Sequence, residues 1–225
     1  MKLAKSKSVY VCCECGAQTA QWLGRCPNCG KFGTLVEEIT ESAAPQKAVK
    51  RERSVSAKRP VPLSEVKEER YSRVSSGIAE LDTVLGGGIV PGSLVLIGGD
   101  PGIGKSTLLT EVSAHLSEKH RVLYVSAEES CSQVKMRCSR LKLDSSNLLL
   151  LNETCLEDIE DAIEDEKFVV IDSIQAVYTS ELSSAAGSVG QVRECAGKLQ
   201  RIAKGRGITF FIVGHVTKEG ALAGP

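Results

Sequence analysis

The sequence predicts an α/β fold with a mostly parallel sheet, preceded by a small cysteine-rich ribbon. Three observations lead to this prediction. Apolar segments of strand and helix character alternate from residue 93 onward, which is typical of a parallel sheet covered by helices on both faces. A glycine-rich phosphate-binding motif lies between the first of these strands and the next helix. Two pairs of closely spaced cysteines precede residue 30.

Length and composition set the outer limits. The chain has 225 residues, enough for one full domain and an appendage. Acidic and basic residues balance at 28 each, so the net charge indicates no partner. Nothing resembles a signal peptide, and no apolar stretch approaches the roughly 20 residues of a membrane span. We therefore expect a cytoplasmic protein without a membrane partner, in which nine cysteines favour metal binding or free thiols over disulfides.

Four cysteines near the N-terminus have the spacing of a zinc ribbon, expected over residues 1–40. They form C-x2-C, a gap of ten residues, and a second C-x2-C. The predicted Zn²⁺ ligands are Cys12, Cys15, Cys26 and Cys29. Two thiolates in such a pair fit one side of a tetrahedral Zn²⁺, and the second pair closes the site, which predicts a structural rather than a catalytic metal. A disulfide and a redox-active pair are the alternatives, and Cys13 has no assigned role.

The ribbon is too short to build a core, so metal binding is expected to supply its folding energy. Its predicted apolar filling is Trp22, Leu23, Phe32 and Leu35. The partner of the ribbon stays open between nucleic acid, another protein and the rest of this chain. Residues 41–63 follow as a predicted flexible basic linker, in which prolines break any helix. This linker is either a solvated tether or a segment that attracts phosphate.

The segment from Gly99 to Ser106 reads G-x-x-x-x-G-K-S, the P-loop pattern, between a strand at 93–97 and a helix. Its backbone N–H groups and the helix N-terminus would cradle the phosphates of ATP. Lys105 would reach the β- and γ-phosphates, and the Ser106 hydroxyl would hold Mg²⁺. The predicted ATP-binding residues are Gly99, Asp100, Pro101, Gly102, Ile103, Gly104, Lys105, Ser106, Thr107 and Asp172.

Residues 64–225 are predicted to form one P-loop ATPase domain. A short helix is expected from about residue 77 to 85, before a glycine triplet. Further strands are predicted at 121–126, 147–151, 168–171 and 208–213, and helices at 131–141, 156–166 and 190–204. Ligands of such sheets bind at the carboxyl ends of the strands.

Polar residues that follow three of these strands are candidate site residues. Asp172 ends an apolar strand in the Walker B position and would orient Mg²⁺. Glu128 could orient or deprotonate the water that attacks the γ-phosphate, although its neighbour Glu129 could take that role instead. His215 could sense the γ-phosphate. For Glu128 and His215, an ordinary loop position is the alternative.

Two segments are candidates for nucleic-acid contact. The loops at 178–190 and 217–224 are rich in small residues, and Lys218 lies in the second. The predicted helix after the first loop carries Arg193, Lys198, Arg201 and Lys204. Flexible loops with nearby cations suit a phosphate backbone, and a merely solvated basic face is the alternative. Cys131, Cys138, Cys155 and Cys195 have no ligand spacing and are expected to be ordinary thiols.

Taken together, the motifs resemble the RadA (Sms) family of bacterial DNA repair proteins, within the RecA-like ATPase superfamily. The resemblance covers nearly the whole chain. It rests on Trp22-Leu23-Gly24-Arg25-Cys26-Pro27, Gly77-Ile78-Ala79-Glu80-Leu81-Asp82, Gly98 to Thr107, Tyr124 to Ser130, Ile171-Asp172-Ser173-Ile174-Gln175 and Val213 to Gly220.

The resemblance implies a DNA-dependent ATPase of recombinational DNA repair. It implies a homo-hexameric ring that binds single-stranded DNA, drives branch migration on branched DNA and works with a recombinase of the RecA type. By position, Glu128 matches the catalytic glutamate of RecA-like ATPases, and His215 lies where the family couples nucleotide to a DNA-facing loop. Together with the P-loop residue Lys105, these are the predicted catalytic residues.

The chain ends at Pro225, before the Lys-Asn-Arg-Phe-Gly motif and the Lon-protease-like C-terminal domain of the family. We therefore expect a C-terminally incomplete RecA-like core that retains nucleotide binding better than hydrolysis. The alternative is a nucleotide-switched module that binds DNA or protein with little turnover. A kinase of the circadian-clock type shares the P-loop, but the zinc ribbon argues against it.

Overall fold

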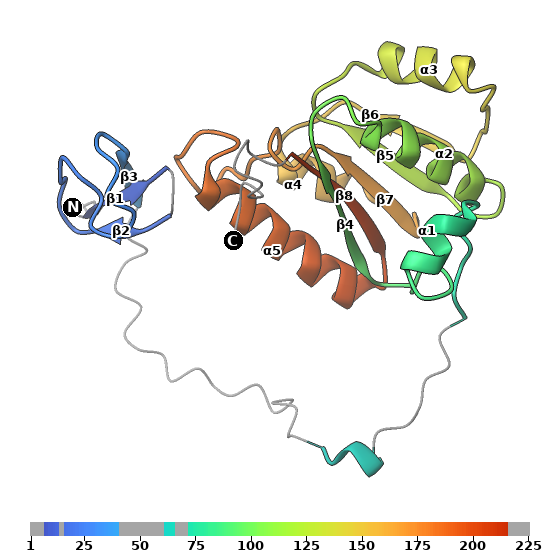
Figure 1. Cartoon of the computed structure of the whole chain (residues 1–225), viewed down its shortest axis with the longest axis horizontal. Coiled ribbons are helices and arrows are strands. Elements are labelled where there is room, and N and C mark those ends of the chain that lie inside the picture. Colours follow the sequence, from blue (N-terminus) through green and yellow to red (C-terminus); the bar gives the residue numbers. More distant parts are fainter. Residues whose placement is uncertain (1–6, 14–15, 41–60, 66–71, 216–225) are drawn as a thin grey trace, which may run out of the picture.

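A parallel five-stranded sheet carries the predicted nucleotide site (Figure 1). The computed structural model describes residues 7–13, 16–40, 61–65 and 72–215. The strands of this sheet are β4 (Leu94–Gly99), β5 (Val122–Ser126), β6 (Leu148–Leu151), β7 (Phe168–Asp172) and β8 (Thr209–His215). Their order is β4-β8-β7-β5-β6, and every pairing is parallel, which confirms the predicted fold class.

Helices cover both faces of this sheet, as the alternation of strands and helices predicts. They are α1 (Ala79–Val84), α2 (Lys105–Ser117), α3 (Cys131–Arg140), α4 (Leu156–Asp161) and α5 (Val189–Arg206), and a single 3-10 turn, η1, spans Leu63–Glu65. Apolar side chains of α1, α2 and α3 pack on one face, and those of α4 and α5 pack on the other. None of the helices in the described ranges is both long enough and apolar enough to cross a membrane.

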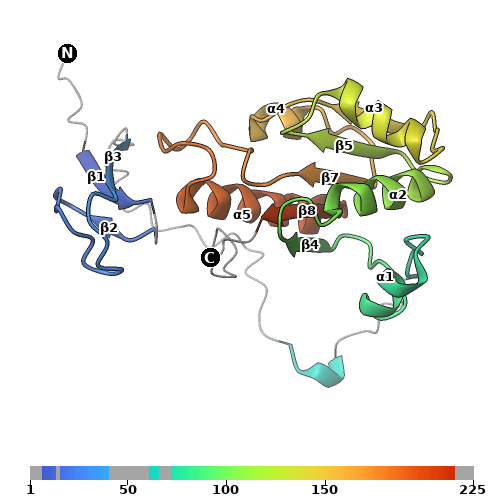
Figure 2. The same ribbon diagram turned by 45° about the horizontal axis from the view of Figure 1, so that its top comes forward.

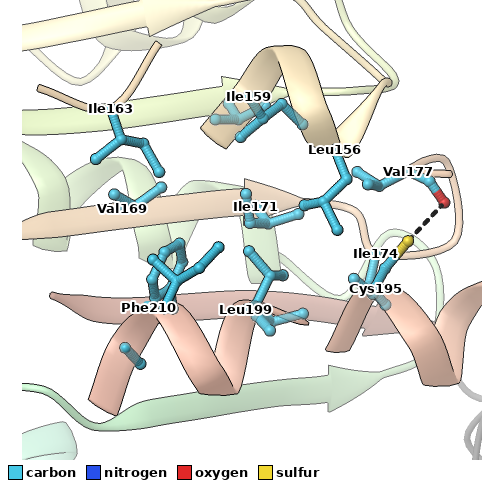
Figure 3. Packing of buried hydrophobic residues seen from close by; sticks show 14 of the residues in the cluster. Leu156, Ile159, Ile163, Val169, Ile171, Ile174, Val177, Cys195, Leu199 and Phe210 are labelled. Carbon is cyan, nitrogen blue, oxygen red and sulfur yellow. Dashed lines mark hydrogen bonds between the residues drawn. The ribbon is translucent and has the colours of Figure 1, made fainter. Parts of the chain in front are cut away.

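The central strands are buried on both faces, because successive side chains alternate between two apolar clusters. In β5, Tyr124 joins the cluster under α2, whereas Val125 joins the cluster under α5. Figure 3 shows the second cluster, in which Leu199 of α5 lies against Ile171 and Phe210 of the sheet. This packing fixes the positions of the strand ends that carry the candidate site.

One predicted helix is too long. The helix expected over 156–166 ends at Asp161, because acidic side chains near a helix C-terminus oppose its dipole. Beyond it, the buried Glu166 carboxylate accepts hydrogen bonds from the Glu164 N–H (2.8 Å) and from Arg121 (2.9 Å). The chain therefore turns into β7 sooner than the apolar spacing indicates.

The carboxyl ends of four strands meet at one edge of the sheet, which Figure 2 shows from a second direction. Gly99 at the end of β4 pairs with His215 at the end of β8. Ser126 at the end of β5 pairs with Asp172 at the end of β7. This register brings residues that are far apart in the sequence to a common edge, where ligands of open α/β sheets bind.

The ribbon has a different construction. Its strands β1 (Lys7–Cys12), β2 (Gln18–Thr19) and β3 (Leu35–Thr40) form an antiparallel sheet in the order β2-β1-β3. Its buried cluster is Cys12, Cys26 and Leu35, so only one of the four predicted filling residues is buried. The prediction was wrong for Trp22, Leu23 and Phe32, which are 59%, 41% and 77% exposed. Cysteine side chains occupy the centre of the ribbon, which leaves no room for those large side chains.

Candidate nucleotide and metal sites

A cavity of about 320 Å³ lies at the carboxyl edge of the sheet. Its size is within the range of small-molecule sites. It brings together most of the predicted nucleotide-site residues. The residues that line it are Pro101, Gly102, Gly104, Lys105, Ser106, Thr107, Glu128, Glu129, Arg137, Asp172 and His215.

The P-loop forms one wall of this cavity, at the junction of β4 and α2. Gly102 and Gly104 have φ values of +81° and +104°, which residues with a side chain rarely adopt, so both positions favour glycine. Lys105 begins α2, and its Nζ donates to the carbonyl oxygens of Gly99 and Asp100, both at 2.8 Å. The loop thus places one ammonium group beside the backbone N–H groups of a helix N-terminus, an arrangement that suits an anionic phosphate group.

Asp172 lies on the opposite wall, at the end of β7, and is almost fully buried. Its Oδ2 accepts a hydrogen bond of 2.6 Å from the phenol of Tyr124. Burial raises the pKa of Tyr124, and the charge of Asp172 raises that pKa further, so the phenol stays a donor. The sequence analysis did not single out Tyr124. One signal in the sequence could have identified it. Tyr124 carries a hydroxyl group on an otherwise apolar strand, and it shares a strand face with Ser126, the polar residue that ends β5.

The two adjacent glutamates, which the sequence could not separate, have different surroundings. Glu128 Oε1 accepts a hydrogen bond from Ser173 Oγ and lies 3.1 Å from His215 Nε2. Glu129 is instead hydrogen-bonded and ion-paired to Arg137. The turn that carries both glutamates is held by Asn152, whose amide donates to the carbonyl oxygens of Ser126 (2.7 Å) and Glu129 (3.2 Å). Glu128 therefore contacts His215, whereas Glu129 is ion-paired with Arg137.

His215 ends β8 beside the P-loop strand. The side-chain amide of Gln175 donates to its carbonyl oxygen at 3.3 Å. Its Nδ1 is buried and has no hydrogen-bond partner within the described ranges. His215 therefore contacts both Glu128 and the segment that follows β7, which is the position that a residue coupling the cavity to a neighbouring loop would need.

Three of the four predicted zinc ligands lie together in the ribbon. The Sγ atoms of Cys12, Cys26 and Cys29 are all within 4.8 Å of one another, and those of Cys12 and Cys29 are 3.7 Å apart. Zn–S bonds of about 2.3 Å at tetrahedral angles place two sulfur atoms about 3.8 Å apart, so these thiols fit a zinc ion. Cys15 lies outside the described residues. Cys13 is exposed and does not belong to this group.

The side chain of Gln191 holds the loop at 178–190, which is predicted to be a flexible DNA contact. This fully buried amide accepts from the Thr179 N–H (2.8 Å) and donates to the carbonyl oxygens of Thr179, Leu182 and Ser184 (3.2, 3.1 and 3.0 Å). The loop at 217–224, including Lys218, lies outside the described residues.

The predicted basic face of α5 is only partly available to a phosphate backbone. The ammonium group of Lys198 is largely buried and pairs with Glu157 (3.0 Å) and Glu181 (2.8 Å). Arg201 pairs with Glu194 at 3.1 Å. Arg193 and Lys204 are exposed. Two of the four cations are therefore engaged with carboxylates within the domain.

Two families match this chain. Residues 58–221 match the family described as an AAA domain, and residues 10–37 match the family described as a rubredoxin metal binding domain. The DNA repair protein RadA of Halalkalibacterium halodurans is 51% identical over 99% of this chain. The protein of the same name from Bacillus subtilis is 50% identical over 99% of this chain. The chain spans about half the length of these relatives, 50% of each.

A likeness among solved structures supports the fold. The crystal structure of a KaiC-like protein from Pyrococcus horikoshii has a TM-score of 0.55, with 21% identity over 67% of this chain and 74% of that chain. At that identity the likeness concerns the fold alone. The AAA domain match covers most of the sequence, and the two RadA relatives cover nearly all of it. The chain therefore belongs to the AAA domain family, and over nearly its whole length it is similar to DNA repair proteins named RadA.

Proposed function

We propose that this chain is the zinc-ribbon and nucleotide-binding part of a DNA-dependent ATPase of recombinational DNA repair. The observation that carries the proposal is the cavity in which the P-loop, Asp172 and Glu128 meet. The names of the 50–51% identical relatives support the repair context.

The P-loop would bind the phosphates of ATP. The backbone N–H groups around Gly102 and Gly104 would donate hydrogen bonds to the phosphates, and the Lys105 ammonium group would add a full positive charge. Within the cavity, Ser106 offers a hydroxyl and Asp172 a carboxylate. Such a pair of oxygen donors fits Mg²⁺, which in P-loop ATPases neutralises the charge of the β- and γ-phosphates.

Glu128 is the better candidate for orienting the attacking water, because Glu129 is engaged with Arg137. Ser173 and His215 hold the Glu128 carboxylate at the cavity. In the reaction, the water oxygen bonds to the γ-phosphorus, the bond from that phosphorus to the ADP oxygen breaks, and Glu128 accepts the water's proton. His215, in contact with Glu128, would report the state of the γ-phosphate to the loop that follows it.

The ribbon would hold a structural Zn²⁺ through Cys12, Cys26, Cys29 and Cys15, because closed sets of thiolates leave no position for substrate. Single-stranded DNA, branched DNA and a RecA-type recombinase are the proposed partners of the complete protein. A homo-hexameric ring that drives branch migration is its proposed assembly. The family resemblance and the AAA domain match support these proposals.

ATP hydrolysis with and without single-stranded DNA tests the proposal, using the zinc-loaded chain and its Lys105→Ala variant. Because this chain is expected to retain nucleotide binding better than hydrolysis, its turnover should be low. We expect single-stranded DNA to raise that turnover and Lys105→Ala to abolish it. Glu128→Gln and Glu129→Gln form a matched pair of neighbouring carboxamides. Glu128→Gln should lower turnover about 10²–10⁴-fold while ATP binding persists, and Glu129→Gln should lower it less. Equal turnover in Glu128→Gln and the parent would remove Glu128 from this role.

The pairing of Arg137 with Glu129 inside the cavity favours a second function. Among its described lining residues, Arg137 is paired with Glu129, which leaves Lys105 as the main cation for the phosphates. A nucleotide-switched binding module with little turnover would have such a site. Tight ATP binding without turnover at any DNA concentration would support this second function. Transfer of labelled phosphate to protein in the same assay would indicate a kinase instead.

A further inference from the structure

Arg137 of α3 lines the cavity with Ser106 and Asp172, and it contacts α2, β5 and the turn after β5. Its Nε donates to Thr110 Oγ1 of α2 at 3.0 Å. One terminal nitrogen bonds Glu129 in the turn after β5, and the other donates to the Tyr124 phenol of β5 at 3.3 Å. Its guanidinium carbon also lies 5.9 Å from the centre of the Tyr124 ring. Every nitrogen of this guanidinium group therefore has a partner within the domain.

Two of these contacts lead to the two residues that would hold Mg²⁺. Thr110, which accepts from Arg137, donates its hydroxyl to the Ser106 carbonyl oxygen at 2.6 Å. Tyr124, the second acceptor, donates its phenol to Asp172 Oδ2 at 2.6 Å. One guanidinium group thus links the first turn of α2 with the end of β7. Tyr124 and Asp172 lie 48 residues apart along the chain.

Burial explains why this linkage should be rigid. The Arg137 side chain is 10% exposed, and Tyr124 and Thr110 are fully buried. A cation in such a place is tolerated when its donors are matched by acceptors in fixed geometry, as they are here. A carboxylate that accepts a hydrogen bond on one oxygen has its rotation restricted, which orients it toward a metal.

We propose that Arg137 and Tyr124 are positioning residues for the magnesium–nucleotide complex, joining Ser106 and Asp172 through a shared hydrogen-bond network. The inference rests on the proposed function, because it takes Ser106 and Asp172 as the groups that hold Mg²⁺. Arg137 lines the cavity, but its three nitrogens bond Thr110, Glu129 and Tyr124, so the proposed role runs through Tyr124 and Thr110. The network also gives Glu129 a role distinct from that of Glu128: it fixes the third side of the guanidinium group.

The test measures Mn²⁺, a paramagnetic substitute for Mg²⁺, by electron paramagnetic resonance. Mn²⁺ is titrated into the full chain with a non-hydrolysable ATP analogue, so turnover is not needed. Tyr124→Phe removes only the phenol oxygen, Arg137→Met removes the guanidinium group, and Arg137→Lys keeps the charge without the planar fork. Arg140→Met is the matched control, because Arg140 is an exposed arginine on the same helix. Affinity for the analogue is measured separately in the absence of metal.

We expect Tyr124→Phe to weaken Mn²⁺ binding about tenfold and Arg137→Met to weaken it about 10–100-fold, the range for residues that orient metal ligands. Arg137→Lys should fall between the parent and Arg137→Met. Arg140→Met should bind Mn²⁺ like the parent. Metal-free affinity for the analogue should not change in any of them. If Arg137→Met fails to fold by circular dichroism, Tyr124→Phe decides the question.

Several outcomes would overturn the proposal. Parent-like Mn²⁺ affinity in folded Tyr124→Phe and Arg137→Met would show that the network does not position the metal. A loss of metal-free nucleotide affinity in Arg137→Met, with Mn²⁺ affinity retained, would make Arg137 a direct phosphate contact. A parent chain that binds no Mn²⁺ beside the analogue would overturn both the magnesium site and this inference. A parent that binds Mn²⁺ normally but shows no hydrolysis would support the nucleotide-switched module over the ATPase for this chain and leave the inference standing.

Discussion

The ribbon and the α/β domain solve the same folding problem in different ways. The α/β domain buries two apolar clusters, one on each face of its sheet. The described part of the ribbon has a buried cluster of two cysteines and one leucine, and it leaves Trp22 and Phe32 in solvent. The difference teaches that apolar burial stabilises the first unit, whereas we expect thiol–metal bonds to stabilise the second.

The largest expected effect is the loss of the ribbon when a thiolate is removed. Structural zinc contributes about 10–16 kcal/mol of apparent binding free energy in small zinc domains. Cys26→Ser should therefore lose zinc and unfold the ribbon while the α/β domain stays folded. Trp22 is the only tryptophan of the chain, so its fluorescence anisotropy follows the ribbon, and far-UV circular dichroism follows the helices of the α/β domain.

Cys13→Ser is the control for this experiment, because Cys13 is exposed and outside the thiol group. It should bind zinc with the stoichiometry of the parent. Equal zinc content in Cys26→Ser and Cys13→Ser would contradict the assignment of the ligands.

The next effect contrasts two phenylalanines, one from each region. Phe210 is 0% exposed in the cluster of Figure 3, whereas Phe32 is 77% exposed. Phe210→Ala should lower the free energy of unfolding of the α/β domain by about 3–5 kcal/mol, because it leaves a cavity. Phe32→Ala should change stability by about 0.5–1 kcal/mol, since it loses the contact with Arg25, 5.5 Å from its ring. Urea unfolding measures both, and equal losses would refute the contrast.

A smaller effect concerns the polar anchor of the loop at 179–188. Gln191→Leu keeps the side-chain size but leaves the Thr179 N–H and three carbonyl oxygens without the amide. The expected cost is about 1–3 kcal/mol, with faster hydrogen exchange confined to this loop. Gln200→Leu is the matched control, since Gln200 is exposed on the same helix. Unchanged exchange in Gln191→Leu would mean that the loop is held by other contacts.

The smallest expected effect is a pH dependence of the free energy of unfolding of the α/β domain. Partial burial alone would raise the pKa of Glu157, but hydrogen bonds from Thr179 and Lys198 lower it to about 2. An unfolded glutamate has a pKa of about 4.3. The ionised Glu157 therefore adds stability that is fully present above pH 4.3 and is lost as the pH falls toward 2.

The measurement is the stability difference between the parent and Glu157→Gln at several pH values, followed by circular dichroism. The difference should be constant near neutrality and should shrink below about pH 4.3. Glu160→Gln, an exposed neighbour on α4, should show no such trend. A difference that grows in acid would show that the sign is wrong.

Much of the fold could be predicted, because the relevant signals are local. Apolar strands, helical spacing and a glycine-rich turn predicted the parallel sheet and the P-loop between β4 and α2. The errors arose where distant groups decide the outcome. The helix predicted over 156–166 stops at Asp161, where the chain goes on to place Glu166 against Arg121. Trp22 and Phe32 are exposed because the ribbon has no second layer to cover them.

The candidate site likewise has residues that local sequence motifs predict and residues that only distant contacts bring together. Motifs selected the P-loop residues and Asp172, and Asp172 and most of the P-loop residues line one cavity. The partners of these residues carried no motif. Tyr124 reaches Asp172 across paired strands, and Arg137 meets Glu129 only because α3 folds back over β5. The choice between Glu128 and Glu129 also required the structure.

By itself, the sequence determined which short segments can bind phosphate or metal, because the glycine spacing of a P-loop and the pairs of cysteines act within a few residues. It also determined that strands and helices alternate, since hydrophobic periodicity is a property of each segment. Only the tertiary structure decided which strand ends meet, which glutamate contacts His215 and which cation contacts Tyr124, the partner of Asp172. These depend on strand register and helix packing, which bring together partners far apart in the sequence, such as Glu128 and His215, 87 residues apart.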